Sequence, residues 1–273
     1  MTKETFPTVG PDSLPEIADL CERALAQQFS SSELEKALFA PDQPALVRFS
    51  KDLGLVATTR DGDSGFIRLI AVDPDQRKRG HGTALLRQAV SDLEGSLDMT
   101  VGADPPYFLF PGVPTTEPEL CYLLERHHFA REEINYNVVV DLASLPEEPS
   151  EAELLSPAER GMIDAWSLEH WPNWRREFLR AFDQGSLLVS HDARGIACAC
   201  AFDVNRAATL GPIASRPDLI GKGAGKRLLQ GALEHMRDLG YDRIEILWVG
   251  PFVPYFRVGG RIGQLFMVYR KRR

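Results

Sequence analysis

The chain has 273 residues, long for one ordinary domain and sufficient for two. Hydrophobic residues make up 44% and charged residues 26%, which excludes a disordered chain or a fibre. The net charge of −8 argues against nucleic-acid binding and favours a neutral or cationic partner. No apolar run approaches the roughly 18–20 residues of a membrane span, and the first residues show no apolar signal core. We therefore expect a cytoplasmic protein whose four cysteines are reduced.

The first half of the chain predicts a layered α/β or α+β sheet. An amphipathic helical stretch covers residues 15–39 and three strands follow, at 45–49, 54–58 and 65–72. The next helix carries apolar residues at helical spacing up to Gly95, and an alternating strand follows at 97–101. An aromatic, proline-rich segment at 104–114 then leads to a strand-like run at 136–142.

An acidic stretch with two prolines, residues 145–153, predicts a linker between a domain at 1–144 and a domain at 154–273. The second half repeats the order of the first. Its predicted elements are a helical opening at 157–182, strands at 186–190, 196–204 and 208–215, a helix up to Gly240, and strands at 243–249 and 264–269. The basic end, residues 270–273, is expected to be solvated.

A shift of 143 residues aligns the two halves without a gap. Over positions 70 to 86, 8 of 17 residues are identical in the two copies, whereas chance would give about one. The halves are therefore interpreted as two copies of one domain.

Each copy has a glycine turn between a strand and a helix, Gly80-His81-Gly82 and Gly223-Ala224-Gly225. Glycine permits φ > 0 and a close backbone approach, and the first N–H groups of the helix then point at one spot. With the helix dipole behind them, these groups form an anion site suited to a pyrophosphate.

Three other kinds of glycine turn could occupy this place. A Walker loop needs glycines five positions apart followed by Lys and Ser or Thr, which neither copy has. A dinucleotide fingerprint needs a third glycine where Leu85 and Leu228 stand. The third alternative is a turn whose glycines serve packing alone. The presence of two copies of the turn in the same strand–turn–helix context makes this alternative weaker.

The first turn, Arg77-Lys78-Arg79-Gly80-His81-Gly82, resembles the acyl-CoA signature [Arg/Gln]-x-x-Gly-x-[Gly/Ala] of the GNAT N-acetyltransferase superfamily. The second copy is similar but has Ile220 at the first signature position and Ser215 where a β-branched apolar residue is usual. The resemblance extends over nearly the whole chain as a tandem pair.

The resemblance implies a mixed sheet splayed open between the fourth and fifth strands of each copy, with the pantetheine arm of acetyl-CoA in the gap. It implies no metal. The residues implied in binding acetyl-CoA are, in the first copy, Ile70, Ala71, Val72, Arg77, Lys78, Arg79, Gly80, His81, Gly82 and Thr83, and, in the second, Ile213, Ala214, Ser215, Gly221, Lys222, Gly223, Ala224, Gly225 and Lys226.

The family's leaving-group acid is often a tyrosine in a pattern like Tyr-x-x-x-Gly-Gly, and Tyr255 matches it, although a core aromatic is the alternative. Leu124 stands at that place in the first copy and has no proton to donate. The first copy thus has the better phosphate loop and the second the better acid. Glu245 and Asp98 are weak candidates for a general base, because both can equally face solvent.

Two further clusters have structural alternatives. The aromatic segment 104–114 is either an acceptor-lining loop or a contact with the other copy, and the tryptophan-rich residues 166–176 are either an acceptor wall or packing between the domains. Cys198 and Cys200 are interpreted as small buried residues, because no other ligand completes a metal site.

The resemblance therefore implies an enzyme that moves an acetyl group from acetyl-CoA to a primary amine of a small-molecule acceptor, by direct attack of the amine in a ternary complex. The sequence predicts neither a nucleic-acid nor a membrane partner. A non-catalytic acyl-CoA binder and a protein or peptide N-acetyltransferase remain alternatives, and the oligomeric state is left open.

Overall fold

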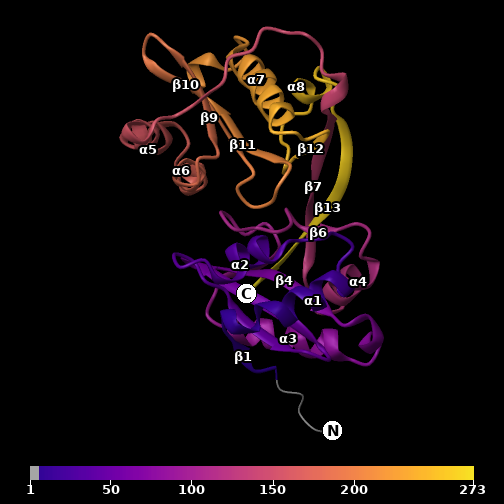
Figure 1. Ribbon diagram of the computed structural model, residues 1–273. Helices are drawn as coiled ribbons and strands as arrows, with labels where there is room; N and C mark the ends of the chain where they lie inside the picture. The colour runs from indigo at the N-terminus through magenta and orange to yellow at the C-terminus, as the bar shows by residue number, and fades with distance from the viewer. Residues whose placement is uncertain (1–5) are drawn as a thin grey trace. The chain divides into compact units, whose positions relative to one another are not determined.

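The computed structural model describes residues 6–273, which belong to two compact units (Figure 1). The first, unit 1, runs up to Asn135 and adds Leu265–Arg273 from the end of the chain. The second, unit 2, is Tyr136–Gln264. Each unit has a mixed sheet with helices on both faces.

Unit 1 has four helices: α1 (Leu14–Ala24), α2 (Ser31–Phe39), α3 (His81–Asp92) and α4 (Pro118–Arg126). Its strands are β1 (Thr8–Val9), β2 (Leu46–Ser50), β3 (Gly54–Asp61), β4 (Ser64–Val72), β5 (Asp98–Val101) and β6 (Val113–Pro114), joined by part of β13 (Arg261–Arg272). The sheet order is β1-β2-β3-β4-β5-β13, with β6 also on β13. One core lies under α1 and α2 and another under α3 and α4.

Unit 2 has α5 (Arg160–His170), α6 (Arg175–Asp183), α7 (Ala224–Asp238) and the short α8 (Val253–Phe256). Its strands are β8 (Glu153–Leu154), β9 (Leu187–Asp192), β10 (Gly195–Phe202), β11 (Thr209–Ser215) and β12 (Arg243–Ile246), with part of β7 (Ala130–Asp141). The sheet order is β7-β12-β11-β10-β9-β8. Helices α5 and α6 cover one face and α7 covers the other.

The last strands of the two copies are exchanged between the units. Strand β13 ends the second copy, but it pairs antiparallel with β5 of unit 1, where Tyr269 lies opposite Val101. Strand β7 ends the first copy, and its second half pairs with β12 of unit 2, where Val140 lies opposite Ile244. Both strands carry buried side chains into the unit that they join. The boundaries 1–144 and 154–273 stay a prediction about the two sequence copies, because the compact units divide differently.

The basic end of the chain, predicted to be solvated, is exposed at Arg272 and Arg273 and half-buried at Arg270 and Lys271, and most of it belongs to a strand. Residues up to Arg272 continue β13, and Lys271 pairs with Met99 of β5. The Arg272 guanidinium lies 2.6 Å from the Glu132 carboxylate. The acidic partners on neighbouring segments explain why a basic run can end inside a strand.

Each predicted helical opening is two helices rather than one. In unit 1, α2 starts afresh at a capping box, in which the Ser30 side chain accepts from the Glu33 N–H and the Glu33 carboxylate accepts from the Ser30 N–H. In unit 2, α5 ends one residue before Trp171-Pro172, and Pro172 opens a short 3₁₀ turn before α6. Caps and a proline override the continuous amphipathic pattern.

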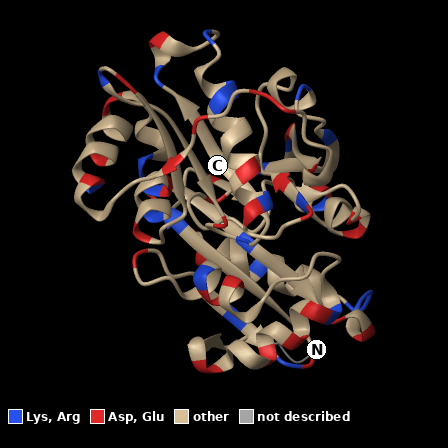
Figure 2. Ribbon diagram, turned by 45° about the horizontal axis from the view of Figure 1, so that its top comes forward, with Lys and Arg blue, Asp and Glu red and all other residues tan. Residues whose placement is uncertain are grey.

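Acidic and basic residues are interspersed along the helices and loops of both units (Figure 2). No helix among residues 6–273 is both long and apolar enough to cross a membrane.

A fully buried ion pair lies in unit 1 at the point where β4 separates from β5. The Arg68 guanidinium donates to the Asp104 carboxylate at 2.6 Å, and Asp104 also accepts from the Thr59 hydroxyl at 2.5 Å. Both charged side chains have 0% exposure. Arg68 also donates to the backbone carbonyl of Ala37 on α2. The pair thus links β4 to the segment after β5 and to α2.

We expect Arg68→Ala to lower the free energy of unfolding by about 3–5 kcal/mol, because it leaves the Asp104 carboxylate buried without a counter-charge. Urea unfolding of this variant and of Arg68→Met with Asp104→Leu measures the effect, and the double variant should recover much of the loss. The exposed Arg87→Ala on α3 is the control. A loss below about 1 kcal/mol would contradict this account.

Candidate functional site

The sheet of unit 1 opens between β4 and β5. Their parallel pairing runs only from Ser64 opposite Asp98 to Ile67 opposite Val101, while β3 pairs with β4 as far as Val72. From Arg68 onward, β4 therefore has no β5 partner. The predicted pantetheine-binding residues Ile70, Ala71 and Val72 lie on this open part.

A tight loop joins the open end of β4 to α3. Gly80 takes φ +95° just before the helix begins at His81, a conformation that favours glycine. The first-turn residues His81, Gly82 and Thr83 present N–H groups with no acceptor inside the helix. The predicted loop thus places three free backbone N–H groups together at the start of α3.

Two of the three basic side chains of this loop are engaged locally. The Arg77 guanidinium donates to the backbone carbonyl of Ala24 on α1 at 2.7 Å, and Arg79 donates to the Gln76 amide oxygen at 3.0 Å. Lys78 is exposed and has φ +62°. The first signature position therefore anchors α1 in this structure.

The α1–α2 side of the opening in unit 1 is filled by the unit's own side chains. Besides the Arg68–Asp104 pair, the Tyr107 ring lies 5.6 Å from the Arg68 guanidinium carbon. Phe110 packs edge-on against Phe29, with ring centroids 5.3 Å apart. The aromatic segment 104–114, one alternative for which was an acceptor wall, is packed into the core on this side.

The sheet of unit 2 opens in the same way between β11 and β12. Only Thr209 and Leu210 have parallel partners on β12, Glu245 and Ile246. The strand then leaves β12 at Gly211, which has φ +134°, and continues beside β10. The predicted residues Ile213, Ala214 and Ser215 lie on the open part of β11.

The second glycine loop has the same helix start as the first. Gly221 and Gly223 take φ +80° and +87°, and α7 begins at Ala224. Ala224, Gly225 and Lys226 form the first turn. This loop is less basic at its rim, because Ile220 is 63% exposed where Arg77 stands in unit 1.

One basic side chain and one backbone carbonyl near the second loop already have partners within unit 2. The Lys226 ammonium lies 2.9 Å from the Glu148 carboxylate, whereas Lys222 is exposed. The Trp171 indole N–H donates to the Ser215 carbonyl at 3.0 Å. A carbonyl oxygen has two lone pairs, so a ligand amide could share Ser215 with Trp171.

The second glycine of each turn allows the helix to pack closely against the strand end. A Cβ on Gly225 would lie 2.7 Å from Oγ of Ser215, whereas one on Gly82 would lie 3.2 Å from Cδ2 of Leu123 and 3.7 Å from Cγ2 of Val72. Val72 and Ser215 are themselves equivalent at the 143-residue shift. The second glycine therefore faces the same strand position in both turns, but the space for a side chain is much tighter in unit 2.

Tyr255 lies on α8, half-buried against the core under α7. Burial raises the pKa of its phenol to about 12, with smaller contributions from the nearby Cys200 and Tyr136. Cys200 is the register partner of Ile213 on β11. The phenol therefore stays protonated at neutral pH and lies beside the strand that opens.

The matching position in unit 1, Leu124, has 0% exposure and belongs to the core under α4. Tyr255 and Leu124 therefore differ in chemistry at corresponding places of the two units.

The weak candidates for a general base both have ion-pair partners. Glu245 pairs with Arg206 and accepts from the Asn137 amide at 3.2 Å. Asp98 lies 3.7 Å from the Arg270 guanidinium. These contacts hold both carboxylates away from the role of a free base.

Sequence reasoning missed Glu177 on α6 of unit 2. Its side chain is buried, and burial raises the pKa of the carboxyl to about 7. Helix α6 is separated by a short 3₁₀ turn from Trp171, which contacts Ser215, and its Arg180 donates to the Val204 carbonyl. Glu177 lies in the first turn of α6. A lone glutamate in an amphipathic helix gives no signal in the sequence that it is buried.

Cys198 and Cys200 are buried free thiols on β10. No group of three or more histidine, cysteine or acidic residues within residues 6–273 could hold a metal ion.

Comparison with known proteins agrees with this geometry. The model of the acetyltransferase (GNAT) family matches residues 14–102 and 147–254, more than half of the chain. A search of curated protein sequences found no match.

Solved structures share the fold at low sequence identity. A GCN5-related glucosamine N-acetyltransferase region of a fungal multi-domain GH3 β-N-acetylglucosaminidase has a TM-score of 0.80 and 17% identity, over 97% of this chain and 38% of that one. A GCN5-related N-acetyltransferase from Sphaerobacter thermophilus has a TM-score of 0.70 and 16% identity, over 97% and 94% of the two chains. A tandem GNAT protein from the clavulanic acid biosynthesis pathway has 0.68 and 14%, over 97% of both.

The family model covers one region in each copy, and both units show the open sheet and the glycine loop that the resemblance implied. The chain therefore belongs to the acetyltransferase (GNAT) family, as a tandem member with two GNAT domains.

Proposed function

We propose that the protein transfers an acetyl group from acetyl-CoA to a primary amine of a small-molecule acceptor, and that unit 2 carries the reaction. The choice of unit rests on Arg68 and Gly211, which are equivalent at the 143-residue shift. Both stand where the strand leaves its parallel neighbour. Arg68 fills that position with a buried guanidinium, whereas a Cβ on Gly211 would have its nearest neighbour, the Leu247 carbonyl oxygen, at 3.5 Å. The absence of a side chain at Gly211 supports unit 2 as the acceptor-binding unit, because in unit 1 the Arg68 side chain occupies the equivalent position.

The residues of unit 2 fit acetyl-CoA, which would supply the thioester carbonyl and the thiolate leaving group. The first-turn N–H groups of α7 suit its pyrophosphate, and the open edge of β11 offers backbone groups to its amides. An N–H of β11 near the reacting carbonyl would stabilise the developing oxyanion. Tyr255, held protonated by its raised pKa, would donate a proton to the leaving thiolate.

Glu177 is our candidate for the base that takes the proton from the acceptor ammonium. A carboxyl with a pKa of about 7 is ionised for about half of the molecules at neutral pH, and it is a stronger base than an ordinary carboxylate. We assign unit 1 a supporting role, as an acyl-CoA binder or scaffold, because Leu124 offers no acid and its opening is filled. The net charge of −8 supports a cationic small-molecule acceptor.

Calorimetric titration with acetyl-CoA tests the sites. We expect Gly225→Asp to abolish binding in unit 2 and all turnover on a panel of primary amines, since it adds a carboxylate at the first turn of α7 and crowds Ser215. Gly82→Asp, its counterpart on α3, should leave turnover within about twofold. Thermal unfolding of both variants controls for misfolding. Absence of acetyl-CoA binding by the wild type, or turnover lost only in Gly82→Asp, would contradict the proposal.

Removal of the Tyr255 hydroxyl should slow turnover with little effect on acetyl-CoA affinity. We expect Tyr255→Phe to lower kcat by about 10²–10⁴-fold, because the thiolate then leaves without a positioned acid. The exposed Tyr122 of α4, changed to Phe, is the control and should match the wild type. Equal turnover of Tyr255→Phe and wild type across the pH range would remove Tyr255 from the mechanism.

Glu177→Gln should separate activity from stability. In the folded protein the Glu177 carboxyl keeps its proton up to a pKa of about 7, whereas in the unfolded chain it loses the proton near pH 4.5. The folded state of the wild type therefore loses stability, relative to the unfolded state, as the pH rises from about 4.5 to about 7. At pH 8 the variant should be more stable by up to about 3 kcal/mol, with kcat/KM about 10²–10⁴-fold lower.

Urea unfolding and a pH–rate profile measure both effects, with the exposed Glu35→Gln as control. A variant that keeps the wild-type profile through pH 7 would show that Glu177 is not the base.

A further inference from the structure

Helix α8, which carries Tyr255, is too short to hold its own position. It runs only from Val253 to Phe256, and Phe252 at its N-cap makes no side-chain capping bond. The Tyr255 N–H donates to the Phe252 carbonyl at 3.1 Å. An isolated helix shorter than about 12–15 residues is at most marginally stable in water. The place of α8 is therefore set by contacts with the rest of unit 2.

A single residue of β7, Tyr136, makes three different contacts with the segment that leads into α8. Its carbonyl accepts from the Val249 N–H at 2.9 Å, and its hydroxyl donates to the Gly250 carbonyl at 2.8 Å. Its ring stacks on Phe252, with ring centroids 4.2 Å apart and planes inclined by 27°. The backbone, the hydroxyl and the ring of one tyrosine thus hold the chain directly before α8.

The ring stack continues into α8 itself. Phe252 stacks in turn on Phe256, the last residue of α8, with ring centroids 4.6 Å apart. Aromatic rings pair in a few preferred arrangements, so a stack of three rings fixes direction as well as distance. The ring of Tyr136 is thereby connected to both ends of α8, and Tyr255 lies between these ends.

Strand β7 also supports the chain where it leaves α8. The Gly260 N–H donates to the Tyr255 carbonyl at 2.9 Å. A Cβ on Gly260 would lie 2.6 Å from that carbonyl oxygen and 2.7 Å from Cγ1 of Val138 on β7. The turn after α8 therefore lies directly against the same strand, two residues beyond Tyr136.

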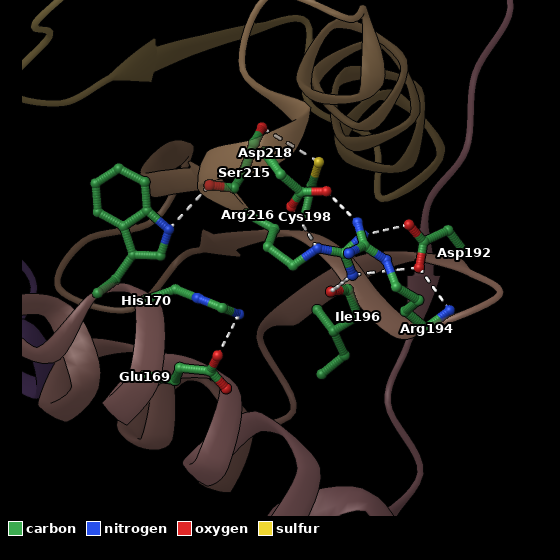
Figure 3. A network of polar contacts seen from close by, with 10 residues as sticks. Glu169, His170, Asp192, Arg194, Ile196, Cys198, Ser215, Arg216 and Asp218 are labelled. Atoms are coloured by element: carbon green, nitrogen blue, oxygen red, sulfur yellow. Dashed lines mark hydrogen bonds and ion pairs between the residues drawn. The ribbon is translucent and has the colours of Figure 1, made fainter.

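The other side of the opening, strand β11, is held by a separate network. At the end of β11, the Ser215 hydroxyl accepts from the Cys198 thiol of β10 at 3.2 Å (Figure 3). The next residue, Arg216, pairs with Asp192 of β9 and with Asp218 in the turn after β11 (Figure 3). The position of β11 thus depends on its neighbours in the sheet, whereas the position of α8 depends on β7.

We propose that Tyr136 is a positioning residue for Tyr255, which holds α8 where the Tyr255 phenol can reach the leaving thiolate. An acid acts only within hydrogen-bond reach of the group that it protonates, and a misplacement of about 1 Å can cost about 10²-fold in rate. The inference rests on the role proposed above for Tyr255. Because β7 ends the first sequence copy, a residue of one copy would position the acid of the other.

Variants of Tyr136 separate the ring from the hydroxyl. We expect Tyr136→Leu, which removes both, to lower kcat about 10–100-fold, while the KM and the Kd for acetyl-CoA stay within about twofold of wild type. Tyr136→Phe keeps the ring stack and should lose no more than about fivefold in kcat.

Tyr241→Leu is the matched control. Tyr241 packs, like Tyr136, half-buried against the core under α7, but its hydroxyl donates to the Asp203 carboxylate at 2.8 Å, in the loop after β10. Its kcat should stay within about twofold of wild type, even if its unfolding temperature falls as much as that of Tyr136→Leu.

A double-variant cycle with Tyr255→Phe shows whether Tyr136 acts through the acid. Once the Tyr255 hydroxyl is absent, Tyr136→Leu should change kcat by less than about twofold, because both changes remove the same contribution. Independent, multiplying losses would overturn the proposal and leave the role of Tyr255 intact. Wild-type turnover of Tyr255→Phe would instead refute the acid itself, and the inference with it.

Hydrogen–deuterium exchange tests the positioning without any turnover. In Tyr136→Leu the amides of residues 252–260 should exchange at least about tenfold faster than in the wild type, while those of α7 keep their protection. In Tyr241→Leu the segment 252–260 should exchange as in the wild type. Unchanged exchange of this segment in Tyr136→Leu, equally faster exchange throughout unit 2, or a wild-type kcat would overturn the proposal.

Discussion

Two parallel strands that stop pairing after a few residues organise each unit of this protein. In unit 2, β11 and β12 share only two register pairs before Gly211 turns the strand away. Backbone N–H and C=O groups that would be hydrogen-bonded in a continuous sheet are therefore left unpaired at this edge. They lie beside the N-terminus of a helix, where the free N–H groups favour an anion. The opening is also what gives three other features their proposed roles: the glycine turn, the tyrosine on α8 and the buried glutamate on α6. A sheet paired along its full length would make the same residues ordinary core and surface.

The two copies show how one opening can be kept or closed with few changes. In unit 1 an arginine at the separation point recruits Asp104 and Tyr107, and the aromatic segment follows them into the core. A buried ion pair is stable only when both partners are present, so this arrangement depends on residues of both β4 and the segment after β5. In unit 2 a glycine, which has no side chain, stands at the same point. The two copies therefore differ most where each sheet opens.

Much of the fold could be predicted from the sequence, because the signals are local. Apolar periodicity located the main strands and helices, and the 143-residue repeat predicted that both turns would have one geometry, as Gly80 at φ +95° and Gly223 at φ +87° now show. The exchange of β7 and β13 could not be predicted, since a strand's own pattern does not record which edge it joins. Glu177 was missed for a related reason: its pKa is set by the burial that tertiary packing imposes. The role of Arg68 depends on Asp104, 36 residues away, and no spacing rule links them.

The exchanged strands also affect how the chain folds as it is made. Domains commonly fold in the order in which they leave the ribosome. Here unit 1 needs Leu265–Arg273, which is synthesised after every other part of either unit, and the buried Phe266 and Tyr269 come with it. Unit 2 needs only Tyr136–Gln264, including a strand that emerges before its other elements. The half encoded second can therefore complete its core first, and the half encoded first must wait for it with an open sheet edge.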